Sequence, residues 1–91
     1  MARPVKIGLV TEVFQSGYRR KSAENRDAID KALRLMAQDL FYRSLRARKM
    51  AGHANIWEAH ASLSVVLTFD FASSDAVRLR ACCNHDIYRK P

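Results

Sequence analysis

Residues 55–88 read NIWEAHASLSVVLTFDFASSDAVRLRACCNHDIY, and they contain three apolar runs separated by short polar breaks. Valine, isoleucine, leucine, phenylalanine and tryptophan dominate the runs, and side chains of these types favour β-strands. The breaks carry serine, leucine and aspartate in the lengths that hairpin connections use. The pattern therefore predicts an antiparallel meander with strands Ile56–Ala61, Ser64–Phe71 and Ala76–Cys83.

Alternation along these strands assigns their side chains to the two faces of the sheet, because successive side chains of a strand point to opposite sides. One face is apolar throughout and carries Trp57, Ala59, Ala61, Val65, Leu67, Phe69, Phe71, Val77, Leu79 and Ala81. The other face is mixed and carries Ile56, Glu58, His60, Val66, Thr68, Asp70, Arg78 and Arg80. This pattern predicts a sheet that helices cover on one side and that is open on the other.

The N-terminal part of the chain predicts one strand and a short helix. The β-prone run Val5–Val10 is expected to join the sheet at an edge. Thr11 is expected to cap a helix whose apolar stripe runs from Phe14 to Tyr18. Gly17 weakens this helix, so a short or irregular one is expected.

A longer amphipathic helix is predicted to follow, with Ser22 at its cap. Its apolar stripe has the i, i+4, i+7, i+11 spacing of one helical face: Ile29, Leu33, Met36 and Leu40. Residues 43–50 hold four basic side chains and are expected to form a short strand that enters the meander. The predicted fold class is α+β, with two N-terminal helices packed on one face of a small, mainly antiparallel sheet in the order β-α-α-β-β-β-β.

The charge balance of the chain favours an anionic partner. Sixteen lysines and arginines stand against nine aspartates and glutamates, which gives a formal charge of +7. Nucleic acid, an acidic protein and a membrane surface all fit this charge, and solubility alone is the alternative reading. The 91 residues are expected to form one domain spanning residues 1–91.

The cysteines and the apolar segments exclude several classes of protein. Cys82 and Cys83 are adjacent, so a disulfide between them would be strained, and a disulfide-stapled secreted domain is disfavoured. Cys82 is expected to point outward and Cys83 into the core. Together with His85 they lack the spacing of a zinc site, so neither a metal nor a cofactor is expected. No apolar run suits a signal peptide or a membrane span, so a soluble cytoplasmic protein without membrane attachment is expected.

Four segments that follow the predicted helices carry a resemblance to a known protein family: SLRARKMAGH (44–53), IWEAH (56–60), VVLTF (65–69) and VRLRACCNHDIYRKP (77–91). This series resembles the RelE/ParE superfamily of toxins from bacterial type II toxin–antitoxin systems. The resemblance implies a ribosome-dependent messenger-RNA endonuclease that inhibits translation. The related ParE-like branch instead inhibits DNA gyrase, and a non-catalytic nucleic-acid-binding member of the same fold is a further alternative.

The resemblance also implies partners. A cognate antitoxin is expected to neutralise the toxin by binding along a groove formed by the helices and the sheet edge. Messenger RNA and the ribosome are the expected targets, or DNA gyrase in the alternative. Operator DNA is expected to be bound only by the complex with the antitoxin.

Cleavage of RNA by attack of a 2′-hydroxyl requires a proton acceptor, charge stabilisation at the phosphate and a proton for the departing 5′-oxygen. Arg78 and Arg80 lie two apart on one strand, and Arg46 and Arg48 lie two apart on another. Both pairs are predicted to present guanidinium donors to phosphate, and Lys49 adds a point charge. Arg80 is assigned to the catalytic set and the others to RNA binding, with contact to antitoxin or to solvent as the alternative for Arg46 and Arg48.

The proton transfers are assigned to side chains beyond the last strand and on the mixed face of the sheet. His85 is the predicted general acid, because the unperturbed pKa of histidine lies near neutrality. His60 and Glu58 are the candidate proton acceptors, and Tyr88 is expected to stack on a base or to orient the scissile phosphate. The alternatives are that His85 and Asp86 only close the last strand by hydrogen bonds and that Glu58 only pairs with a nearby arginine.

Three positions depart from the pattern of active ribonucleases in this superfamily, and one of them is Leu63, which is apolar near a turn where polar residues are usual. Val66 stands where an arginine usually precedes a hydrophobic-hydrophobic-aromatic triplet, and His60 stands where arginine is frequent. Loss of one guanidinium from a phosphate site removes about 2 to 4 kcal/mol of transition-state stabilisation. The remaining arginines compensate, or the chain is a weak or non-catalytic member, or the gyrase alternative applies.

Overall fold

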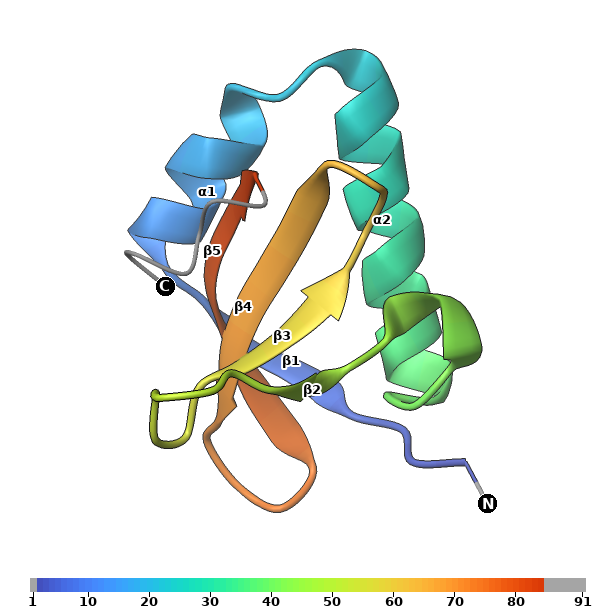
Figure 1. The fold of residues 1–91 in the computed structure, drawn as a ribbon, viewed down its shortest axis with the longest axis vertical. Helices are drawn as coiled ribbons and strands as arrows, with labels where there is room; N and C mark the ends of the chain where they lie inside the picture. The colour runs from blue at the N-terminus through green and yellow to red at the C-terminus, as the bar shows by residue number, and fades with distance from the viewer. Residues whose placement is uncertain (1, 85–91) are drawn as a thin grey trace.

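The computed structural model of the chain describes residues 2–84. Its elements, in chain order, are β1 (Lys6–Val10), α1 (Glu12–Arg19), α2 (Ala23–Gln38), the 3-10 turn η1 (Arg43–Leu45), β2 (Arg48–Lys49), β3 (Trp57–His60), β4 (Val65–Phe71) and β5 (Ala76–Asn84). This order confirms the predicted α+β class (Figure 1). The 3-10 turn was not predicted, and it leaves only two residues for the strand expected in 43–50.

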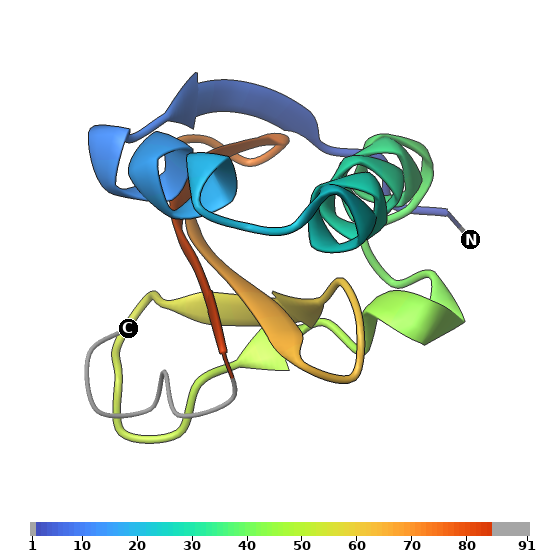
Figure 2. The same cartoon turned by 90° about the horizontal axis from the view of Figure 1, so that it is seen from above.

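The sheet has the strand order β1-β5-β4-β3-β2. Strands β2 to β5 pair antiparallel in chain order, so the predicted meander is confirmed. Strand β1 runs parallel to β5 at one edge, as expected for an edge strand. A parallel partner needs a long crossover, and here the segment from α1 to β4 provides it. In Figure 2 the helices lie on one side and β2 and β3 on the other, with the twisted β4 and β5 between them.

Helix α1 begins at Thr11, whose hydroxyl oxygen accepts a hydrogen bond of 3.1 Å from the Phe14 N–H. The same hydroxyl donates to the Arg80 carbonyl at 2.8 Å, so the cap also ties the helix to β5. Gly17 allows a close approach of the two elements, because a Cβ atom at this position would lie 3.0 Å from the Cys82 carbonyl oxygen. The glycine that weakens the helix therefore serves its packing.

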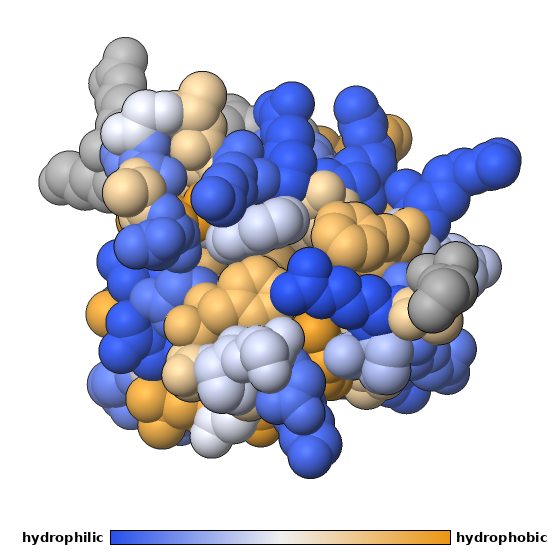
Figure 3. All heavy atoms as spheres, turned by 90° about the horizontal axis from the view of Figure 1, so that it is seen from below, coloured by the Kyte–Doolittle hydropathy of each residue, from blue (hydrophilic) through white to orange (hydrophobic). Residues whose placement is uncertain are grey.

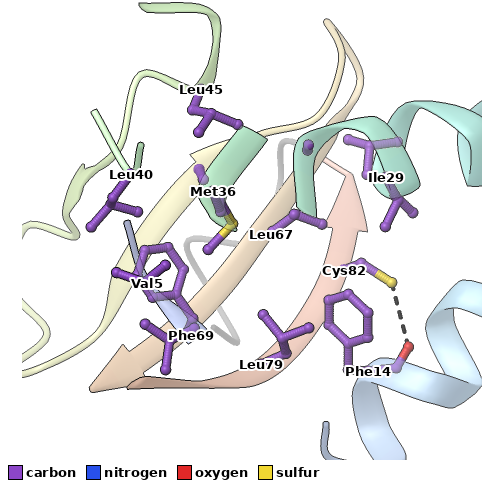
Figure 4. Close-up of a cluster of buried hydrophobic side chains, with 14 residues drawn as sticks. Val5, Phe14, Ile29, Met36, Leu40, Leu45, Leu67, Phe69, Leu79 and Cys82 are labelled. Atoms are coloured by element: carbon purple, nitrogen blue, oxygen red, sulfur yellow. Dashed lines mark hydrogen bonds between the residues drawn. The ribbon is translucent and has the colours of Figure 1, made fainter. Parts of the chain in front are cut away.

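Helix α2 begins at the predicted cap, where the Ser22 hydroxyl oxygen accepts from the Asn25 N–H at 3.1 Å. The helix buries Ile29 and Met36 against the meander, and Leu40, just beyond its end, is also buried. Figure 4 shows these side chains converging on strand residues of the core. The fully buried members of this helix-side core are Ile29, Met36, Leu40, Leu45, Ala59, Val65, Leu67, Phe69, Val77 and Leu79.

A β-bulge in β5 changes which residues face this core. Thr68 lies opposite Ala81 and Phe69 lies opposite Leu79, so Arg80 is an extra residue in the strand. From this point each side chain lies on the face opposite to the one that strict alternation assigns. The assignment of Ala81 to the apolar face was therefore wrong.

The same bulge reverses the faces of the sheet on which the two cysteine side chains lie. Cys82 lies opposite Leu67, is buried in the helix-side core, and its thiol donates to the Phe14 carbonyl oxygen at 3.5 Å (Figure 4). Cys83 is partly buried on the other face of the sheet. The prediction that Cys82 points outward and Cys83 into the core was wrong, because it assumed an unbroken alternation.

The face of the sheet away from the helices is not open along its whole length. Met50 and Val66 are buried there in a second apolar cluster, against which Ile56 and Cys83 pack. Glu58 and Thr68 on this face are also fully buried. The exposed part of the face is therefore smaller than the sequence pattern predicted.

Candidate functional site

Arg78 and Arg80 of β5 meet at one carboxylate, that of Asp70 in β4. Asp70 lies directly opposite Arg78, and the two share hydrogen bonds of 3.1 Å from Nε and 2.5 Å from Nη2. Arg80 donates from Nη1 to the same carboxylate at 3.2 Å. The side chains of Arg78 and Arg80 remain 44% and 33% exposed. We call Arg78 and Arg80 the arginine pair, and we call Asp70 its anchor.

The charges in this group reinforce one another. The hydrogen bonds from Arg78 are the main reason that the pKa of Asp70 lies below its ordinary value, and Arg80 adds to the effect while burial opposes it. The same hydrogen bonds raise the pKa of Arg78. The anchor is therefore ionised near neutral pH, and the group carries two positive charges against one negative charge.

The sequence predicted that Arg78 and Arg80 lie together, and the structure brings them together. It did not predict the anchor, although Asp70 was assigned to the same face. The missing signal is register, which decides which cross-strand side chains lie close enough to interact. The sequence does not fix the register of β4 against β5, because the bulge at Arg80 shifts it.

Glu58 has a different position from the one that a proton acceptor needs. Its side chain is fully buried, and one carboxylate oxygen forms an ion pair with Nε of Arg48, which lies opposite it in β2. The other oxygen has no hydrogen-bond partner among residues 2–84. A buried, paired carboxylate cannot reach the hydroxyl of a bound RNA, so the structure supports the alternative that Glu58 pairs with an arginine.

Arg46 does not lie on a strand with Arg48. It follows η1 with a left-handed backbone, φ 50°, so the predicted alternation of the two arginines along one strand was wrong. A surface hollow of about 410 Å³ contains Arg46 and the partly buried His60. Its lining residues are Ser44, Arg46, His60, Ala61, Ser62 and Leu63.

Lys49 is separated from the other predicted RNA-binding residues. It lies opposite Trp57, whose side chain packs against the helix-side core. Residues directly opposite in a sheet share a face. Lys49 therefore lies on the helix side of the sheet, whereas Arg48 lies on the side of the arginine pair.

His85 and Tyr88, the predicted general acid and stacking residue, lie outside the described residues. Their assigned roles therefore remain predictions. Within residues 2–84, no three histidine, cysteine, aspartate or glutamate side chains come close enough together to hold a metal ion. In the same part of the chain, no helix has the length and apolar character needed to span a membrane.

An apolar hollow of about 290 Å³ lies between the two helices and the β1 edge of the sheet. Its lining residues are Ile7, Val10, Phe14, Gln15, Tyr18, Arg19, Asp30, Leu33 and Leu79. The Tyr18 hydroxyl donates to Asp30 at 2.9 Å across it and thereby joins α1 to α2. This is the part of the fold where a groove formed by the helices and the sheet edge was expected.

By sequence, no family model matches the chain, and no curated protein matches it either. Its structure resembles a YoeB/ParE toxin from Agrobacterium tumefaciens, with a TM-score of 0.71 and 16% identity over 89% of this chain and 99% of the other. It also resembles the RelB-RelE antitoxin–toxin complex from Methanococcus jannaschii, with a TM-score of 0.69 and 14% identity over 91% of this chain and 99% of the other.

A third similar structure is the DinJ-YafQ complex from E. coli, with a TM-score of 0.60 and 12% identity over 86% of this chain and 91% of the other. The chain therefore has the RelE/ParE-like toxin fold, with two helices packed on a five-stranded mixed sheet. Its structural neighbours are toxins of toxin–antitoxin systems, and two of them were solved with an antitoxin.

Proposed function

We propose that the chain is a RelE/ParE-superfamily toxin of a type II toxin–antitoxin system, and that it cleaves messenger RNA at the ribosome in the cytoplasm. The main support is the likeness of fold to RelE, YoeB/ParE and YafQ toxins over most of the chain. The arginine pair supplies the second support, since it offers partly exposed, oriented guanidinium groups to a phosphate.

In this proposal the arginine pair holds the scissile phosphate and stabilises the charge that develops on it during attack by the 2′-hydroxyl. Asp70 fixes the two guanidinium groups before the substrate arrives, which lowers the cost of ordering them. The proton of the hydroxyl passes to water, because His60 lies opposite Val66, four residues or about 13 Å along β4 from Asp70, and does not reach the phosphate that the arginine pair holds. His85 donates a proton to the departing 5′-oxygen, and Tyr88 stacks on a neighbouring base.

Val66 contributes no charge to this site, and in this chain the position has a different role. Val66 is fully buried in the second apolar cluster, where it packs with Met50. In this chain the position serves packing, and the guanidinium groups come instead from β5. The proposal therefore assigns the phosphate contact to the arginine pair and none to position 66, which lies opposite Cys83.

The proposed antitoxin binds in the hollow between the helices and β1. The lining is mainly apolar, which suits the apolar face of an amphipathic helix. Such a partner leaves the arginine pair on the other face of the sheet uncovered, so inhibition would act by excluding the toxin from the ribosome. Operator DNA would be bound by the complex.

A second candidate function is inhibition of DNA gyrase, or nucleic-acid binding without catalysis. The observation that favours it is the burial of Glu58, which leaves His60 as the one predicted proton acceptor that is partly exposed. A site with fewer acid–base groups suits binding better than cleavage. The two candidates differ in what happens to RNA when growth stops.

Controlled expression in cells without the antitoxin tests the proposal. We expect growth arrest together with new 5′ ends inside translated messages, and both should be lost when Arg78 and Arg80 are replaced together by glutamine. Arg19→Gln is the matched control, because Arg19 is an exposed arginine of α1 that pairs with Glu12. Arrest with intact messages and DNA-damage signalling would support the gyrase candidate instead.

A further inference from the structure

A cluster of aromatic side chains lies away from the arginine pair, on the helix side of the sheet. Phe41 and Tyr42 follow α2 and are 49% and 47% exposed. Trp57 lies partly buried beside Phe41, and Phe71 lies partly buried beside Trp57. The face seen from below in Figure 3 shows apolar side chains set between strongly hydrophilic ones. We call Phe41, Tyr42, Trp57 and Phe71 the aromatic patch.

Three rings of the patch, those of Phe41, Trp57 and Phe71, are linked through Trp57 to the core. The Trp57 ring centroid lies 6.5 Å from that of Phe41 and 5.6 Å from that of Phe71. It also lies 6.3 Å from the ring of Phe69, which is fully buried. Aromatic pairs at these distances stabilise each other beyond the burial of their surface. The exposed ring of Phe41 is therefore held in place before any ligand binds.

Positive charges surround these rings. The Arg3 guanidinium lies 5.8 Å from the centroid of the Phe41 ring and 5.0 Å from that of the Phe71 ring. Lys49 lies opposite Trp57 on the same face, and Arg43 follows Tyr42 directly in the chain. All three basic side chains belong to exposed residues. The Arg3 guanidinium therefore lies over two rings of the patch, and Lys49 and Arg43 are exposed basic residues next to it in the sheet and in the chain.

The carboxylate next to the patch in the chain serves the backbone. One oxygen of Asp39 accepts hydrogen bonds from the N–H of Arg3 at 2.9 Å and from the N–H of Phe41 at 3.0 Å. The hydrogen bond from Arg3 is the main reason that the pKa of Asp39 lies below its ordinary value. Asp39 therefore fixes the segments that carry Arg3 and Phe41 to one another.

We propose that the aromatic patch is a binding site for single-stranded RNA, separate from the arginine pair. Exposed rings between cations are the arrangement that binds unpaired bases by stacking and phosphates by charge. A duplex hides the faces of its bases, and an acidic protein segment uses the cations without needing the rings. The observations therefore favour a single strand. This inference does not depend on cleavage by the chain.

The fluorescence of Trp57 tests the site directly, because Trp57 is the single tryptophan of the chain. The probe is a polyuridine RNA of about ten nucleotides, a length within the usual footprint of such sites. We expect the RNA to quench Trp57. Phe41→Ala and Tyr42→Ala should each weaken binding about tenfold, and Arg3→Gln should lower the salt dependence by about one phosphate contact.

The controls separate this site from the arginine pair. Arg19→Gln removes an exposed arginine of α1, and Leu63→Ala removes an exposed apolar side chain of the β3–β4 turn, so neither should change the quenching. Replacement of Arg78 and Arg80 should leave the quenching intact even where it abolishes cleavage. Absence of quenching would overturn the inference. So would unchanged affinity in the folded Tyr42→Ala protein, or equal quenching by duplex RNA or by polyglutamate.

Discussion

The guanidinium of Arg78 and the carboxylate of Asp70 face each other across β4 and β5 and share two hydrogen bonds, of 3.1 and 2.5 Å. Two parallel bonds fix the plane of the guanidinium as well as its position. Since Arg78 is nearly half exposed, the ion pair contributes modestly to stability, on the order of 1 kcal/mol or less. The ion pair therefore matters more for the orientation of the Arg78 guanidinium than for the stability of the fold.

Replacement of the anchor tests this distinction. Asp70→Asn removes the charge that orients Arg78 and Arg80 and raises the net charge of the protein by one. We expect the affinity for RNA to be kept or increased, and the rate of RNA cleavage to fall about tenfold, because orientation is lost. Asp75→Asn is the control, since Asp75 pairs with Lys6 in an exposed position. Unchanged cleavage in Asp70→Asn would show that the anchor has no part in the reaction.

The effect of Asp70→Asn on the free energy of unfolding should depend on pH. The pKa of Asp70 is lower in the folded protein than in the unfolded chain, so folding is favoured by this group above its unfolded pKa of about 4. The contribution is lost as the pH falls through the folded value. Urea unfolding of the wild type and Asp70→Asn should therefore differ at neutral pH, and the difference should disappear as the pH falls below the folded pKa. A difference that grows toward acid pH would contradict this assignment.

Gly17 is predicted to be required for the packing of α1 on β5. At a solvent-exposed position inside a helix, alanine is more favourable than glycine by up to about 1 kcal/mol. Here its Cβ would lie 3.0 Å from the Cys82 carbonyl oxygen and 3.2 Å from the Cys82 sulfur. Because the carbonyl belongs to the sheet and cannot move freely, Gly17→Ala should destabilise the protein by about 1 to 2 kcal/mol. Denaturant unfolding measures this, with Ser16→Ala as the control, and a gain in stability would contradict it.

Cys82 is predicted to be unreactive in the folded protein. Burial raises the pKa of its thiol to about 11, and the thiol donates to a carbonyl oxygen of α1. The thiolate is the reactive form, so labelling should be slow. Labelling of Cys83→Ser, which keeps only Cys82, should proceed far more slowly in buffer than in urea. The comparison protein is Cys82→Ala, and equal native and denatured rates in Cys83→Ser would refute the prediction.

The fold was predictable because hydrophobic periodicity reports the elements that bury one face. The meander, the edge strand and both helix caps, Thr11 and Ser22, follow from local patterns. The bulge at Arg80 does not, since it depends on contacts between distant segments, such as the bond from Thr11 to the Arg80 carbonyl. Periodicity alone therefore placed Cys82 and Cys83 on the wrong faces.

The candidate site was predictable only in part. Arg78 and Arg80 were found because residues two apart on one strand tend to share a face. Asp70 was missed because the register of two strands depends on residues that are distant in the sequence. Arg46 was misplaced because its left-handed backbone ends η1 and interrupts the expected strand. The burial of Glu58 depends on what covers the sheet, which an alternating pattern does not report.

A reconstituted translation reaction tests the central claim most directly. Purified protein is added to ribosomes that translate a defined message, and primer extension maps the 5′ ends that result. The account predicts new ends within the translated region with the wild type and with Arg19→Gln, and none when Arg78 and Arg80 are both glutamine. Intact message with the wild-type protein, or the same ends with the double variant, would contradict it.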